Sequence, residues 1–270
     1  MSKHNQYYRD TDFRPEHSAG HTLLVQLGNA TFSYAVIGEN KLIAFEEGLD
    51  FKELSAPSEG NELLAADYKE RIIGLPQTGF TLMPVSLFKP DLTADISRFL
   101  DVKTNEKVFS QSLDNENRVI FKVDESLVTL TDQFEVKSIV FCAKGWITAI
   151  AKSDPAKETI YLNIGNDKVE LLNFKDGKLR FYNSFEFKNA DELVYYTAFV
   201  AEELQLQQHD ATLVLGGDVE EGDKNSSRLA NFFRKVELND LKPVDIPAQI
   251  SPCTILSLTA LSLCGSSAAH

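Results

Sequence analysis

Short runs of apolar residues occur near the start and again near the middle of this chain, and the two regions match each other. Residues 23–29 (LLVQLGN) return as residues 160–166 (IYLNIGN), and the match continues without a gap to residues 41–42 and 178–179. Each copy has the composition of strand, glycine-containing turn, strand, turn and strand. A gapless self-match over three strands indicates two lobes of common design.

An amphipathic helix is predicted after the second copy, over residues 191–206. Asn189 can cap it, and Glu192 stands three residues later, as in a capping box. Its predicted apolar stripe consists of Leu193, Tyr196, Val200 and Leu204. Further helices are expected over residues 227–236 and 254–264, and the apolar spacing of residues 91–100 predicts one more in the first half.

The run Ser153-Asp154-Pro155 favours a boundary between the lobes. We therefore expect a first lobe over residues 21–152 and a second lobe over residues 153–265. Residues 1–20 are polar and charged, which predicts an N-terminal tail or an edge segment. Residues 101–134 form either a compact subdomain or a simple insertion, and the sequence leaves both open.

Composition narrows the possible partners. Hydrophobic residues make up 43% of the 270 positions, which is enough for well-packed cores. The formal net charge of −13 and the absence of a Lys/Arg stripe argue against nucleic acid, because phosphate backbones are held by clustered cations. Such acidity fits solubility, and an acidic adaptor with its partner on the surface of the first lobe is a further hypothesis.

The cysteines and the chain ends predict a cytoplasmic protein. The three cysteines show no C-x-x-C spacing and have apolar neighbours, as reduced buried thiols do. Residues 1–20 lack the apolar stretch of a signal peptide. The apolar run over residues 254–264 is too short to span a bilayer and has no basic flank for binding a membrane surface, so we expect a buried helix and no transmembrane segment.

Repeated three-strand meanders that begin at a glycine turn resemble the actin-like ATPase superfamily, whose lobes are ribonuclease-H-like. In the second lobe, Asn163–Gly165 resembles the second phosphate hairpin of that superfamily, and Leu213–Gly217 resembles its adenosine motif. The lobe order is similar to that of pilus-assembly and cell-division actin-like proteins. The resemblance implies a mixed α/β fold of two such lobes, with mixed sheets flanked by helices.

The chain also resembles a bacterial family known as domain of unknown function 3822. That resemblance rests on residues 80–88 (FTLMPVSLF), on the hairpins over residues 163–185 and on residues 213–218, and it covers about residues 22–263. It implies an actin-like fold and no particular activity, because a fold alone does not define a function.

The resemblance also implies where a nucleotide site would lie, and it implies that acidic residues of that site have been lost. Active members of the superfamily have aspartate where this chain has Gln26 and Asn163. Mg²⁺ is a hard cation that prefers carboxylate oxygen, and phosphoryl transfer depends on charge neutralisation, so amides at both positions favour a pseudo-ATPase. Possible nucleotide-binding residues are Gln26, Gly28, Asn29, Asn163, Gly165, Asn166, Asp167, Gly216 and Gly217.

Two features leave open the alternative that the chain is an active enzyme. Gly28 and Gly165 would let the backbone approach a phosphate closely, and Asp167, just past the second glycine, is a candidate metal ligand, although Asp is also common in turns. The acidic residues 220–223 would repel phosphates. We expect no catalytic residue, no resident metal and no cofactor beyond weakly held ATP and Mg²⁺.

Other site chemistries are disfavoured. His17 and His21 have i, i+4 spacing but lack the glutamate of a zinc helix, and the chain has no G-x-S-x-G or Walker A motif. The sequence therefore favours a degenerate actin-like module that binds a protein partner; the alternative is an active or weakly active ATPase or phosphotransferase.

Overall fold

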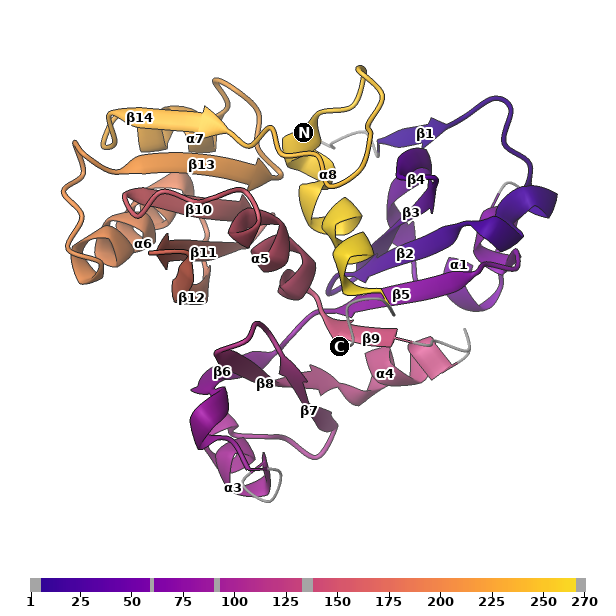
Figure 1. The fold of residues 1–270 in the computed structure, drawn as a ribbon, viewed down its shortest axis with the longest axis horizontal. Coiled ribbons are helices and arrows are strands. Elements are labelled where there is room, and N and C mark those ends of the chain that lie inside the picture. The colour runs from indigo at the N-terminus through magenta and orange to yellow at the C-terminus, as the bar shows by residue number, and fades with distance from the viewer. Residues whose placement is uncertain (1–5, 59–60, 90–92, 133–137, 266–270) are drawn as a thin grey trace. The chain divides into compact units, whose positions relative to one another are not determined.

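The computed structural model describes residues 6–58, 61–89, 93–132 and 138–265, and it has a mixed α/β fold with three sheets flanked by helices (Figure 1). The strand orders are β1-β4-β3-β2-β5-β9, β6-β8-β7 and β12-β11-β10-β13-β14. The strands are β1 Tyr7–Arg9, β2 Thr22–Leu27, β3 Thr31–Gly38, β4 Lys41–Asp50, β5 Glu70–Leu75, β6 Gly79–Pro84, β7 Glu106–Ser112, β8 Asn117–Asp124, β9 Ser138–Phe141, β10 Thr159–Ile164, β11 Lys168–Lys175, β12 Lys178–Glu186, β13 Thr212–Gly217 and β14 Lys235–Leu238.

Most of the helices are short, and several are single turns. The α-helices are α1 Lys52–Ser55, α2 Glu62–Ala65, α3 Thr93–Ser97, α4 Glu125–Asp132, α5 Ala143–Ala151, α6 Ala190–Glu203, α7 Lys224–Ala230 and α8 Pro252–Thr259. The 3-10 helices are η1 Pro15–Gly20, η2 Val85–Leu87, η4 Arg98–Leu100 and η5 Ala260–Cys264. No helix in the described ranges has the length and apolarity needed to span a bilayer.

The backbone contacts divide the chain into two compact units. Unit 1 comprises residues 1–145 and 258–270, and unit 2 comprises residues 146–257. The chain thus leaves unit 1 within α5 and returns to it within α8, so that η5 packs with β2 and β5 of unit 1.

The two larger sheets share one topology. In unit 1 the run β4-β3-β2-β5-β9 has the same order and the same pattern of antiparallel and parallel neighbours as β12-β11-β10-β13-β14 in unit 2. The register also repeats, because Gln26 faces Ser33 as Asn163 faces Glu170. The sequence match therefore corresponds to equivalent positions in three dimensions.

The turns and irregularities of the meanders repeat as well. Glu39-Asn40 and Asp176-Gly177 each form a two-residue connection with positive φ at both positions, the backbone that fits the twist of a hairpin. Both second strands shift register at the same place, after Val36 in β3 and after Asn173 in β11.

The core of unit 2 lies between its sheet and two helices. Every second residue of β10 points into this core, as the two-residue period of a strand requires; these residues are Ile160, Leu162 and Ile164. Helices α6 and α7 lie side by side and cover that face of the sheet (Figure 1). Asn189 caps α6 as predicted, since its Oδ1 accepts the N–H groups of Asp191 and Glu192 at 3.0 Å each.

Several local predictions were wrong. Residues 235–236 were predicted to be helical, but α7 ends at Ala230 and residues 235–238 pair in parallel with β13. Strand β5 and helix α4 were not predicted at all. The predicted helix over residues 91–100 is a short α3 followed by η4, and its residues 91–92 lie outside the described part of the chain.

The N-terminal segment includes an edge strand. Tyr7–Arg9 pairs antiparallel with β4, which was one of the two alternatives for residues 1–20. All three cysteines are reduced thiols, as expected; Cys253 and Cys264 are buried, whereas Cys142 is partly exposed.

The segment of residues 101–134 contributes two strands to a small sheet with β6. The rings of Phe109, Phe121 and Phe141 pack in a row from this sheet to β9, with centroid separations of 5.5 and 5.1 Å. Gln111 of β7 also bonds the backbone of β9: its Nε2 donates to the Ile139 carbonyl at 2.6 Å and its Oε1 accepts the Phe141 N–H at 2.9 Å. One amide therefore satisfies two backbone groups at the edge of the larger sheet.

An enclosed ion pair anchors the other end of the small sheet. The Lys122 ammonium lies 3.0 Å from a Glu106 oxygen, and both side chains are nearly inaccessible to solvent. Burial raises the pKa of Glu106, but hydrogen bonds from the Lys103 N–H, the Thr78 hydroxyl and Lys122, together with the charge of Lys122, outweigh it and lower the pKa to about 2.

We predict that Gln111→Ala lowers the free energy of unfolding by about 1–3 kcal/mol, because two backbone groups of β9 lose their partner. Urea denaturation followed by circular dichroism measures this change. The exposed Gln207→Ala substitution is the control and should have little effect. An unchanged midpoint for Gln111→Ala would show that water replaces the amide at no cost.

We also predict an acid dependence for the Glu106 ion pair. The pKa of Glu106 is lowered from 4.5 in the unfolded chain to about 2, so its stabilising contribution is fully present above about pH 4.5 and is lost as the pH falls toward 2. The stability difference between the wild type and Glu106→Gln should shrink over this range in urea titrations. The exposed Glu186→Gln variant is the control, and an equally steep change there would contradict the assignment.

Candidate functional site

The predicted phosphate hairpin of unit 2 is the turn between β10 and β11. The Gly165 N–H donates to the Lys168 carbonyl at 2.8 Å and closes the turn. Asn166 and Asp167 are exposed at its tip, and the Asp167 carbonyl accepts the Phe187 N–H at 2.8 Å. The hairpin is therefore held by backbone bonds, and its tip presents polar side chains to solvent.

Asn163 lies at the base of this hairpin and forms part of a hydrogen-bonded row of side chains. Its Nδ2 donates to Glu170 Oε2 at 2.8 Å, and the Tyr182 hydroxyl donates to Glu170 Oε1 at 2.6 Å. The row runs across three neighbouring strands, on the face of the sheet opposite the core that α6 and α7 cover. Each oxygen of the Glu170 carboxylate thus accepts a hydrogen bond from a neutral side chain.

The glycine pair after Leu215 lies beside Asn163. Parallel pairing of β10 with β13 aligns Asn163 with Gly216 and Ile164 with Gly217. Gly217 has φ of +83°, and a Cβ there would lie 2.8 Å from Asn163 Oδ1 and collide with the Ile164 carbonyl. Only glycine tolerates this backbone and this close approach, so the second glycine of the motif has a structural role.

Gly216 is covered by the first turn of α8. A Cβ on Gly216 would lie 3.4 Å from the Cys253 carbonyl oxygen. The buried Cys253 thiol in turn approaches the Val219 carbonyl at 3.9 Å. The loop after β13 is therefore packed on one side by the start of α8.

The acidic run after this loop leads into α7. Asp223 caps the helix, with its Oδ1 accepting the Ser226 N–H at 2.7 Å and its Oδ2 accepting the Glu220 N–H at 3.0 Å. Ser226 Oγ donates to the Glu220 carbonyl at 2.8 Å. A carboxylate of the chain itself thus accepts one N–H group of the first turn of α7 and one of the preceding loop.

Unit 1 repeats the hairpin with different side chains. The Gly28 N–H donates to the Thr31 carbonyl at 2.8 Å, the counterpart of the Gly165 bond, and Asn29 is exposed. Gln26 is half-buried and aligns with Gly74 of β5, as Asn163 aligns with Gly216. A Cβ on Gly74 would lie 3.2 Å from the Leu261 side chain of η5.

No metal cluster accompanies these residues. Across the described ranges, no three His, Cys, Asp or Glu side chains lie close enough together to hold an ion. His21 packs against Phe13, with ring centroids 5.0 Å apart, which is a packing role. Among the described residues, the two hairpins therefore offer Mg²⁺ amides, backbone groups and fewer than three clustered acidic side chains.

The structure places Asn163, Gly165, Gly216 and Gly217 within one unit. It adds Glu170, Tyr182 and Gly74, which the sequence analysis did not name. Glu170 and Tyr182 are separated from Asn163 by one and two hairpin strands, so antiparallel register is what brings them together. Gly74 had a usable signal, because the parallel strand after each meander carries a glycine beside the amide residue.

Comparison with known structures places the fold. A protein of Bacteroides thetaiotaomicron VPI-5482, with an actin-like ATPase fold and unknown function, superposes with a TM-score of 0.76 at 21% identity, over 92% of this chain and 97% of that one. A chain of the PilM–PilN type IV pilus biogenesis complex gives 0.65 at 12% identity, over 92% and 98%. The cytoplasmic domain of EpsL, an inner membrane component of the type II secretion system of Vibrio cholerae, gives 0.51 at 13% identity, over 91% and 96%.

The chain therefore has the actin-like ATPase fold. No curated protein matches its sequence significantly. The family described as "Protein of unknown function (DUF3822)" matches residues 10–236, which is most of the chain. On that match, the protein belongs to the DUF3822 family.

Proposed function

We propose that this chain is a binding or assembly module with an actin-like fold that does not hydrolyse ATP and that acts by holding a protein partner. The Asn163–Glu170 hydrogen bond is the observation that carries the proposal. It supports a neutral side chain at the position where the superfamily's active members have aspartate.

An acid at position 163 is electrostatically incompatible with the present surroundings. Asn163 Nδ2 lies 2.8 Å from Glu170 Oε2, so an aspartate would place two carboxylates in contact. Two like charges at that distance repel strongly unless one is protonated or a cation lies between them. The strands are thus adapted to an amide donor.

The polar groups around Asn163 also favour the loss of ATP hydrolysis. Phosphoryl transfer relies on metal ions and cations to neutralise developing charge. The amide of Asn163 is engaged with Glu170, and both Glu170 oxygens already accept hydrogen bonds from neutral groups. The Asp223 carboxylate adds negative charge at the start of α7, beyond the glycine pair.

The structural neighbours support a role in protein assembly by analogy. One of them comes from a PilM–PilN type IV pilus biogenesis complex, and another is the cytoplasmic part of an inner membrane component of a secretion system. Both share the fold of this chain at low sequence identity. A module that presents surfaces to another protein needs only the stable scaffold, which this chain retains.

Weak nucleotide binding without hydrolysis is compatible with this proposal. The Gly28 and Gly165 turns keep the same backbone bond in both units, so the shape of the phosphate hairpins is preserved. The proposal concerns the loss of metal-dependent hydrolysis, which depends on charge rather than on hairpin shape.

We predict that Asn163→Asp lowers the free energy of unfolding by about 1–3 kcal/mol at neutral pH, because a donor becomes a second carboxylate. Thermal and urea unfolding measure the loss. Asn163→Asp combined with Glu170→Gln should recover most of it by restoring an amide–carboxylate pair. The matched control is Asn166→Asp, the same chemical change at the exposed turn, and an equal loss there would contradict the explanation.

We predict that millimolar Mg-ATP raises the melting temperature no more than tripolyphosphate, a control for non-specific anion effects. A nucleotide present at 100 times its dissociation constant would stabilise the fold by about 2.7 kcal/mol. That corresponds to a shift of several degrees for a protein of this size. A shift of that size with Mg-ATP alone, together with ATP turnover that Asp167→Ala abolishes, would overturn the proposal.

A further inference from the structure

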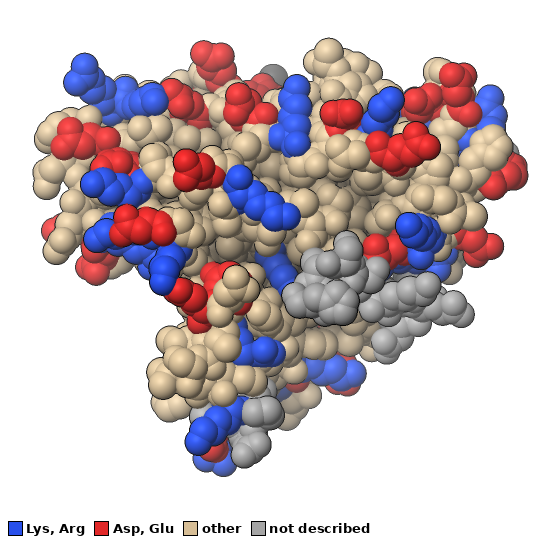
Figure 2. Space-filling view, viewed as in Figure 1, with Lys and Arg blue, Asp and Glu red and all other residues tan. Residues whose placement is uncertain are grey.

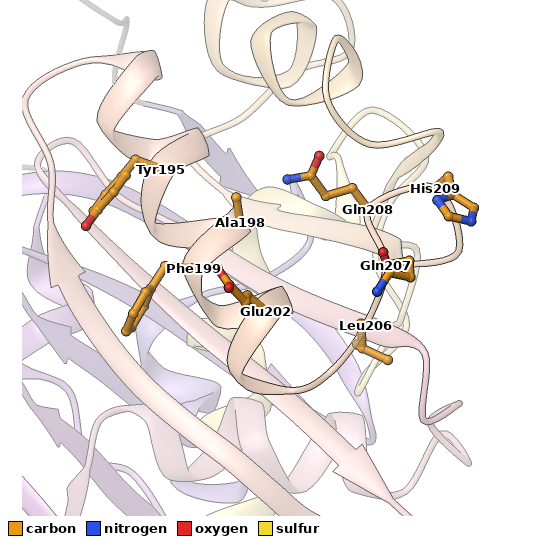
Figure 3. Close-up of a pocket in the computed structure, with 8 residues that line it drawn as sticks. All are labelled: Tyr195, Ala198, Phe199, Glu202, Leu206, Gln207, Gln208 and His209. Atoms are coloured by element: carbon orange, nitrogen blue, oxygen red, sulfur yellow. The ribbon is translucent and has the colours of Figure 1, made fainter.

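Helix α6 has an exposed aromatic face as well as its buried one. Leu193, Thr197 and Val200 point into the core of unit 2. On the other side, Tyr195 and Phe199 are 64% and 45% exposed. Figure 3 shows these two rings projecting from successive turns on the same side of the helix. Adjacent aromatic side chains that are exposed to solvent indicate a binding surface more often than a single exposed aromatic side chain does.

An open groove of about 610 Å³ adjoins these rings. It is formed along α6 and the connection to β13, with Ala198, Glu202 and residues 206–209 as the remaining lining (Figure 3). Ala198 and Leu206 are half-buried and pack on the core of unit 2, so the groove has an apolar floor. The groove lies on a regular helix and the segment that follows it.

Neighbouring rings support Tyr195. Tyr195 packs edge-on against Tyr196, with centroids 5.3 Å apart, and Tyr196 stacks on Phe185 of β12 at 4.8 Å. A ring that is already fixed loses little conformational entropy when a partner covers it. Tyrosine is also a frequent anchor residue of interfaces.

Along α6 and the segment after it the charged residues are Asp and Glu, whereas Arg180 and Arg228 approach from neighbouring elements. Residues 189–210 contain Asp191, Glu192, Glu202, Glu203 and Asp210 but no Lys or Arg. Asp191 is paired with Arg228 at 2.6 Å, and Arg180 of β12 donates to the Leu204 carbonyl at 2.8 Å. In the part of the chain that the structure describes, neither Glu202 nor Glu203 forms an ion pair.

We propose that this α6 groove, defined by Tyr195, Ala198, Phe199, Glu202 and residues 206–209, docks an amphipathic segment of a protein partner that carries Lys or Arg beside apolar residues. Apolar side chains of that segment would cover the aromatic rings, and its cations would face Glu202 and Glu203 or lie over the rings. The inference rests on the proposed function and names the surface through which the module binds.

The acidic residues of α6 argue against a membrane surface or a second copy of this chain as the occupant of the groove. Anionic membrane lipids attract basic surfaces, whereas this one is acidic. A second copy of the chain brings a formal net charge of −13, and self-association through α6 would place its carboxylates against one another. On the face that Figure 2 shows, Lys and Arg are interspersed with Asp and Glu, so the acid-only helix differs from that mixed surface.

Fluorescence anisotropy with a labelled helical peptide of Leu and Lys tests the proposal on the full chain. We expect saturable binding that weakens about tenfold or more in Tyr195→Ala/Phe199→Ala. Glu202→Gln/Glu203→Gln should weaken binding and reduce its salt dependence. Both pairs of residues are exposed, so the fold should be retained, which circular dichroism checks.

Matched controls separate this surface from general acidity. Leu87→Ala/Phe99→Ala removes two exposed apolar residues of unit 1, and Glu220→Gln/Glu221→Gln removes two carboxylates elsewhere in unit 2. Neither should change the affinity, and a peptide with Glu in place of Lys should not bind. Equal weakening by the controls, no binding to the wild type, or preferential binding to anionic vesicles would overturn the inference. The Mg-ATP experiment would be unaffected by any of these outcomes, so a failure of the groove and a failure of the proposed function can be told apart.

Discussion

The parallel pairing of each meander's first strand with the strand that follows the meander is the constraint on which the candidate sites depend. It places an amide residue directly beside a glycine, Gln26 beside Gly74 and Asn163 beside Gly216. In unit 1 the absence of a side chain on that glycine lets η5 pack closely, and in unit 2 the first turn of α8 covers the corresponding glycine. The ends of these strands are therefore crowded by the chain itself, and their backbone geometry is fixed before any ligand is considered.

The charge at the base of the second hairpin differs from the charge in the superfamily's active members, although the shape of the hairpin is kept. The hairpin turns retain their backbone bonds, but the side chain at the base of the second hairpin is a neutral donor serving a neighbouring carboxylate. Removing a charge from a position and supplying a compensating hydrogen bond is a stable arrangement, because each polar group keeps a partner. We propose that this stability accompanies the loss of the ancestral chemistry and leaves a scaffold that is free to serve as a binding module.

Helix α6 shows how such a scaffold can carry a binding surface at little structural cost. Its buried face packs on the sheet, and its N-terminus is satisfied by Asn189 and by Glu192, whose carboxylate accepts the Lys188 N–H at 2.8 Å. The helix is therefore stable without help from its outer face. Tyr195 and Phe199 on that outer face contribute little to the core, so they are available for an interaction with another molecule.

The sequence by itself predicted the two meanders and the cap of α6, because these depend on neighbours a few residues apart. Strand β5 was missed because its few apolar residues, broken by Gly74, give no periodic signal, and it becomes a strand only between β2 and β9. Residues 235–236 have helical spacing but pair with β13, so the long-range hydrogen bonds of the sheet outweigh the local preference. The contact of Asn163 with Glu170 and the return of the chain to unit 1 within α8 likewise required the tertiary structure, since strand register and packing bring those residues together. The groove on α6 is lined by residues close in sequence, but which of them stay exposed is decided by how the helix packs on the sheet.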